Sequence, residues 1–67
     1  MDEFEFAIWL ESELRKRNMT NMQLAKRTGI CPSALTHYLS YDRSPTLKTF
    51  MAILDALHMH IEIVHND

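Results

Sequence analysis

Hydrophobic residues recur at helical spacing along most of this 67-residue chain. A stripe with members three to four residues apart is typical of an amphipathic helix, and the first one predicts a helix over about Phe4 to Arg17. Its members are Phe6, Ala7, Leu10 and Leu14. A second stripe predicts a helix from Leu47 to about Leu57, with Thr46 as its N-cap. That stripe consists of Leu47, Phe50, Ile53, Leu54 and Leu57.

Two shorter helices are predicted between these, joined at Gly29, the only glycine of the chain. Thr20 and Gln23 have the spacing of a capping box at the start of the first. Pro32 suits the first position of the second. Because glycine tolerates the positive φ of a tight turn, we expect a helix-turn-helix over about residues 21–39. Its expected inward positions are Leu24, Ala25, Ile30, Leu35 and Tyr38.

The pattern changes near the end of the chain, where apolar residues alternate with their neighbours. Met59, Ile61 and Ile63 recur with a period of two, which predicts a strand over about residues 59–65. A lone strand leaves its backbone N–H and C=O groups unpaired and therefore needs a partner. We expect two copies to pair these tails as an antiparallel ribbon, so that Met59, Ile61 and Ile63 make the contacts of a homodimer.

Size and composition predict a single, mainly α domain that covers residues 1–67. The single cysteine excludes an internal disulfide and fits a reducing, cytoplasmic setting. The longest apolar run, Phe6 to Leu10, is far shorter than the roughly 20 residues that span a bilayer. Met1 is followed by acids rather than by the basic start of a signal peptide, so we expect a cytoplasmic protein without membrane contact.

The net charge of −2 conceals a strong segregation along the chain. Residues 1–14 carry −5, residues 15–48 carry +6 and residues 49–67 carry −3. All lysines and arginines thus lie in the segment that contains the predicted helix-turn-helix. A local basic face favours phosphate binding even when the net charge of the chain is negative. The alternative is that the clustered charges form an ordinary solvated surface.

From about Leu10 to Leu57 the chain resembles the Cro/C1-type (lambda-repressor-like, XRE) helix-turn-helix regulators. The matching segments are Thr20 to Ala25, Gly29-Ile30, Ser33 to Leu35, Tyr38 and Arg43 to Leu47. The resemblance implies a four-helix DNA-binding domain. The tail is similar to the strand-pairing tails of Cro-like phage proteins and helix-turn-helix antitoxins. Family members commonly have glutamine where Pro32 stands and glycine where Tyr41 stands.

The resemblance also implies that the helix beginning at Pro32 enters the major groove of DNA. We expect four outward side chains to face base edges, and they are Pro32, Ser33, Thr36 and His37. His37 is expected to donate to guanine, while Pro32 contacts a thymine methyl group. The expected phosphate contacts are Asn21, Tyr41, Arg43, Ser44 and Lys48. The alternative is that the four base-edge candidates are ordinary surface residues.

No catalytic chemistry is expected, because no nucleophile, base and orienting group stand in a recognisable order. We therefore predict no enzyme and no cofactor. His58 and His60 suggest a metal, but His65 falls on the opposite strand face and no other ligand completes a set, so none is expected. Cys31 is interpreted as a small substitute for a helix cap, with redox sensing as the alternative.

Three functions fit these observations. The first is a sequence-specific repressor that binds double-stranded DNA with an inverted repeat as a homodimer. The second is an antitoxin, which would also bind a toxin protein through Phe4, Ile8 and Trp9 or through the tail. These three residues lie outside the first apolar stripe, and they either cover part of the core or contact a partner. The third, an interaction module without DNA binding, is disfavoured by the charge segregation.

Overall fold

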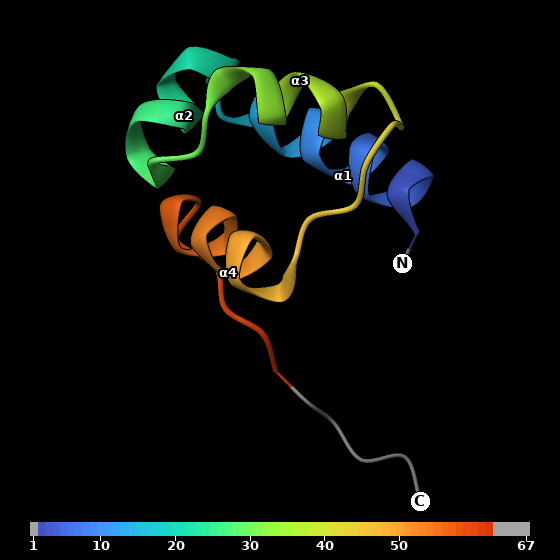
Figure 1. The fold of residues 1–67 in the computed structure, drawn as a ribbon. Coiled ribbons are helices and arrows are strands. Elements are labelled where there is room, and N and C mark those ends of the chain that lie inside the picture. The colour runs from blue at the N-terminus through green and yellow to red at the C-terminus, as the bar shows by residue number, and fades with distance from the viewer. Residues whose placement is uncertain (1, 63–67) are drawn as a thin grey trace, which may run out of the picture.

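The computed structural model describes residues 2–62, which form four helices. They are α1 (Glu3–Lys16), α2 (Asn21–Thr28), α3 (Pro32–Leu39) and α4 (Leu47–Ala56). In Figure 1, α2 and α3 lie with α1 on one side of the molecule, and α4 crosses opposite them. Helix α1 packs on α3, and α2 packs on both α3 and α4, while aromatic rings of α1 also contact Phe50 of α4. The predicted four-helix fold is confirmed, with helix ends within one residue of the expected positions.

Three helices begin at a capping side chain. Asp2 accepts a hydrogen bond from the Glu5 amide at 2.8 Å, and Thr46 accepts one from the Thr49 amide at 3.2 Å. Thr20 forms the complete capping box that the sequence predicts. These side chains satisfy backbone donors that have no partner inside a helix.

Each helix is closely followed by a residue with left-handed backbone conformation. Gly29 has φ of 76° after α2, and within residues 2–62 the other positive φ values belong to Asn18, Tyr41 and His58. After α1, α3 and α4, the following amides donate back to helix carbonyls in the Schellman arrangement, as Met59 N–H does to the Leu54 carbonyl at 2.8 Å. Each short connection therefore reverses the chain within a few residues.

One apolar core joins all four helices. Its fully buried side chains include Phe6, Leu10, Leu24, Leu35, Ile53 and Leu57. The expected inward positions of the helix-turn-helix contribute to it or pack against it. Leu47 was expected in the stripe of α4 but is 72% exposed, so that prediction is wrong. It is the first residue of α4, and its side chain tilts toward the N-terminal end of the helix.

The three apolar residues of α1 outside the stripe have different surroundings. Trp9 packs at the edge of the core, with its ring centroid 5.9 Å from those of Phe6 and Phe50. Phe4 and Ile8 are about half exposed, at 54% and 48%. Of the three side chains considered for a partner, two are therefore accessible.

No strand occurs within residues 2–62. The segment after α4 runs away from the four helices (Figure 1), and its described part, residues 59–62, has no regular structure. The rest of the predicted strand, including Ile63, lies outside the described residues. Since a strand requires a second strand beside it, a single copy does not test this prediction.

Candidate nucleic-acid interface

The turn between α2 and α3 is fixed by hydrogen bonds on both sides of Gly29. The Gly29 N–H donates to the Ala25 carbonyl at 2.9 Å. Beside it, the Thr28 hydroxyl donates to the Leu24 carbonyl at 2.8 Å and accepts from the Ile30 N–H at 3.1 Å. Ile30 in turn packs against the core. The turn that orients α3 relative to α2 is therefore held by backbone groups, one hydroxyl and the packing of Ile30.

One face of α3 is buried and the opposite face is exposed. Leu35 is completely buried and Tyr38 is 6% exposed, so both anchor the helix to the core. All four side chains expected at base edges lie on the exposed part of α3, and they are Pro32, Ser33, Thr36 and His37. The fold thus presents these residues together, as a helix that enters a groove requires.

Three of these side chains already have a local hydrogen-bond partner. Ser33 Oγ lies 3.1 Å from Cys31 Sγ, and the Thr36 hydroxyl donates to the Pro32 carbonyl at 3.1 Å. His37 Nδ1 lies 2.6 Å from an oxygen of Asp42. These contacts restrict the side-chain rotamers in the free protein. Less conformational entropy is therefore lost when the side chains become ordered against DNA.

Cys31 occupies the N-cap position of α3. No capping hydrogen bond from its side chain is found within the described chain. The Ser33 hydroxyl, together with the amides of Ser33 and Ala34, lowers the pKa of the Cys31 thiol. The residue is exposed, and it takes the cap position expected from the sequence without a capping hydrogen bond from its sulfur.

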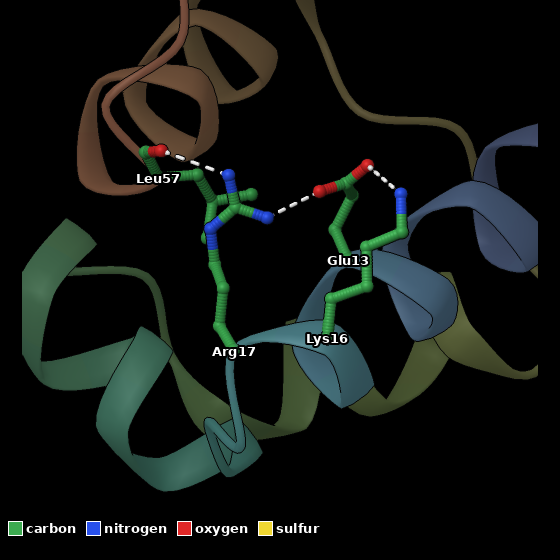
Figure 2. A network of polar contacts seen from close by, with 4 residues as sticks. All are labelled: Glu13, Lys16, Arg17 and Leu57. Atoms are coloured by element: carbon green, nitrogen blue, oxygen red, sulfur yellow. Dashed lines mark hydrogen bonds and ion pairs between the residues drawn. The ribbon is translucent and has the colours of Figure 1, made fainter.

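The cations of α1 are engaged by acids of the same helix. Arg15 pairs with Glu11 at 2.7 Å and Lys16 with Glu13 at 3.5 Å. Figure 2 shows the Arg17 guanidinium between the Glu13 carboxylate and the Leu57 carbonyl, to which it donates at 3.3 Å. Arg17 thus joins the end of α1 to the end of α4, which is a structural role.

The remaining cations make no ion pair with any residue in the range 2–62. They are Lys26 and Arg27 on α2, Arg43 in the α3–α4 connection and Lys48 on α4, and all four are exposed. The positive charge still available to a polyanion therefore lies on the helix-turn-helix and on the segment that follows α3. Paired charges on α1 contribute much less, since their field is largely cancelled locally.

A family model of the helix-turn-helix domain, HTH_3, matches residues 10–64. The chain belongs to this family. Its members are Cro/C1-type (XRE) DNA-binding regulators, so the protein is a DNA-binding transcriptional regulator of this type. Searches of curated proteins and of solved structures returned no significant match.

The phosphate contacts expected for this helix-turn-helix regulator are all exposed, but two already have neighbours. The Tyr41 ring stacks on Phe4, with centroids 4.8 Å apart and an angle of 31° between the rings. The Ser44 hydroxyl donates to the Glu3 carboxylate at 3.3 Å, so it would have to change partner to bind a phosphate. Asn21, Arg43 and Lys48 have no comparable side-chain partner within residues 2–62.

Two contacts of the interface escaped the sequence analysis. Asp42 was not considered as a partner of any side chain, yet it pairs with His37. Phe4 was assigned to the core or a partner, yet it stacks on Tyr41. Both contacts involve the turn at Tyr41, which has left-handed backbone conformation. The glycine that family members commonly have at this position was the one signal of that conformation, since a tyrosine by itself does not indicate it.

The residues expected at the dimer contact differ in their surroundings. Met59 packs against the core of its own chain. Ile61 is 44% exposed, and Ile63 lies outside the described residues. Among the described residues 59–62, Ile61 is therefore the exposed apolar side chain.

Two further observations concern residues 2–62 only. No helix there is long and apolar enough to cross a membrane. No group of three or more His, Cys, Asp or Glu side chains comes together in a way that could hold a metal ion.

Proposed function

We propose that the protein is a repressor that binds an inverted-repeat operator as a homodimer. The observation that carries the proposal is the exposed face of α3, in a chain whose unpaired cations lie on α2, after α3 and on α4. Cations there would position the protein on phosphates, while Ser33, Thr36 and His37 read base edges. Binding at a promoter would then exclude the polymerase.

The tail supports a dimer. Two recognition helices about 34 Å apart would read half-sites separated by one turn of DNA. Ile61 leaves its apolar side chain exposed on a segment that runs away from the helices (Figure 1). A second tail beside it would bury that side chain and pair the backbone groups of both segments.

The DNA proposal is tested by a gel shift with DNA from the protein's own promoter. Arg43→Ala should weaken binding to all sequences, while Arg15→Ala, the same charge change at a residue paired with Glu11, should have little effect. If a dimer neutralises about six phosphates, log K should fall with log salt at a slope near −5, and Arg43→Ala should reduce that slope by about 2. No shift at low salt contradicts the proposal.

The dimer is tested by sedimentation of the whole chain. Ile61→Lys should yield monomers and weaken DNA binding, because a buried lysine in the ribbon costs more than the tail contact provides. Leu47→Lys places the same side chain at another exposed apolar position and should leave the dimer intact. A wild-type protein that stays monomeric at micromolar concentration contradicts the dimer.

An antitoxin role is the second candidate, and the exposed pair Phe4 and Ile8 on α1 supports it. They lie four residues apart on one helix and offer about half of each side chain to a partner. A toxin protein encoded beside this one should then bind the wild type but not Ile8→Glu, with DNA binding unchanged. If the two proteins do not associate, the antitoxin role is contradicted and the repressor role is the proposal that remains.

A further inference from the structure

His37 and Asp42 form the closest polar side-chain contact on the face of α3 proposed to meet DNA. His37 lies in the last turn of α3, and its Nδ1 is 2.6 Å from Asp42 Oδ2. Both side chains remain accessible, at 46% and 61% exposure. The pair is therefore formed by geometry at the surface and not by enclosure in the core.

The end of α3 explains how Asp42 reaches back to His37. Tyr41 has φ of 62°, and its N–H donates to the Tyr38 carbonyl at 3.4 Å. The next amide, that of Asp42, donates to the carbonyl of His37 itself at 3.2 Å. Main chain and side chain of Asp42 are thus both bound to His37, five residues earlier.

The chemistry of this contact fixes one nitrogen of the ring. An ionised carboxylate accepts hydrogen bonds and donates none, so the proton between the two groups belongs to Nδ1. In a neutral imidazole the other nitrogen, Nε2, then carries no hydrogen and acts as an acceptor. With Nδ1 occupied by Asp42, Nε2 is the ring nitrogen left for DNA.

We propose that Asp42 is a specificity-determining residue, which makes His37 an acceptor for an exocyclic amino group in the major groove. That group belongs to adenine (N6) or cytosine (N4), since guanine and thymine present acceptors there. This inference rests on the proposed function, in which His37 faces base edges. It replaces the expectation that His37 donates to guanine, because Nε2 of the neutral ring and the major-groove atoms of guanine are both hydrogen-bond acceptors.

The first test uses the free protein and measures which ring nitrogen of each histidine is protonated, by ¹⁵N NMR at about pH 8, above the ordinary histidine pKa of about 6.5. His37 should show the Nδ1–H form. His60, whose Nε2 lies 3.2 Å from Glu62, should show the opposite form and serves as an internal reference. Asp42→Ala should abolish the preference of His37. A wild-type His37 with the proton on Nε2 overturns the proposal.

The second test selects binding sites from DNA with randomised half-sites at the same pH. The base position whose preference disappears in His37→Ala should be adenine or cytosine in the wild type, preferred about fivefold or more. Asp42→Asn should admit guanine at that position, because an amide can donate to Nδ1 and leave Nε2–H as a donor. The control Asp55→Asn removes the same charge from an exposed residue of α4 and should keep the wild-type preference.

Guanine at that position in the wild type, or an unchanged preference in Asp42→Asn, overturns the role of Asp42. Selection of no sequence by the wild type instead contradicts the proposed function, and with it the base assignment. The NMR result still reports whether Asp42 fixes the ring. The two failures are therefore distinguishable.

Discussion

The turns before and after α3 use the same backbone conformation in different ways. Gly29 has φ of 76° and Tyr41 has φ of 62°. A Cβ placed on Gly29 would meet nothing within 4 Å in the described chain. The Tyr41 side chain, in contrast, stacks on Phe4. One turn is made by a residue without a side chain, and the other holds a large side chain in place.

The difference shows what each turn does. Left-handed backbone costs an ordinary residue about 1–2 kcal/mol, and glycine avoids that cost. Tyr41 accepts it, and its aromatic contact offsets about 0.5–1.5 kcal/mol. The turn after α3 thereby places the Asp42 carboxylate within hydrogen-bond distance of His37. The first turn orients the helix, whereas the second arranges side chains on its exposed face.

The largest effect is expected at the first turn. Gly29→Val should destabilise the protein by about 2 kcal/mol, since a β-branched residue is particularly unfavourable at positive φ. Urea denaturation measures the change. Because the space around Gly29 is open, the cost should come from the backbone and not from a clash.

Gly29→Asn separates these two causes. Asparagine is larger than alanine but tolerates left-handed backbone, so it should cost less than Gly29→Ala. The opposite ranking would mean that space, and not backbone conformation, requires glycine here.

A third turn, at the end of α4, extends the comparison. It has a left-handed residue at His58, and Arg17 donates to the carbonyl just before it, that of Leu57. Arg17→Met keeps the aliphatic stem but removes this bond together with the ion pair to Glu13, so it should cost at least about 1 kcal/mol in urea denaturation. Arg15→Met, at an exposed pair, should cost almost nothing. Equal costs would show that Arg17 does not tie the two helices.

The same variant should change the response to acid. The hydrogen bond from Arg17 is the main cause that lowers the pKa of Glu13 below its ordinary 4.5, although burial opposes it. A carboxyl group whose pKa is lowered by folding stabilises the folded protein fully at any pH above its ordinary pKa. This stabilisation is lost as the pH falls through the lowered pKa of the folded state. The difference in the free energy of unfolding between the wild type and Arg17→Met should therefore become smaller in acid. A difference that stays constant between about pH 7 and pH 3 contradicts this prediction.

How far the sequence predicts the structure depends on what marks each feature. Gly29 and the Thr20 capping box have local signatures, so the helix-turn-helix was predictable almost to the residue. The exposed face of α3 follows from helical spacing once Leu35 and Tyr38 are buried. The pairing of Asp42 with His37 was missed because it depends on a left-handed Tyr41, a conformation that few tyrosines adopt and that only the glycine common in the family at this position indicated. Met59 was assigned to the dimer contact because its alternation with Ile61 is visible, while its packing on the core depends on how α4 ends.

The smallest effect tests the second turn directly. Tyr41→Gly relieves the strained backbone but loses the contact with Phe4, so its stability should stay within about 0.5 kcal/mol of the wild type. His58→Gly relieves the same conformation at an exposed residue and should gain about 0.5 kcal/mol.

Phe4→Ala should cost about 0.5–1 kcal/mol in the wild type and clearly less when Tyr41→Gly is already present. This double-mutant cycle, measured by urea denaturation, isolates the ring contact. If Phe4→Ala costs the same in both backgrounds, Phe4 does not hold Tyr41, and the turn must keep its conformation through the backbone hydrogen bonds of Tyr41 and Asp42 alone.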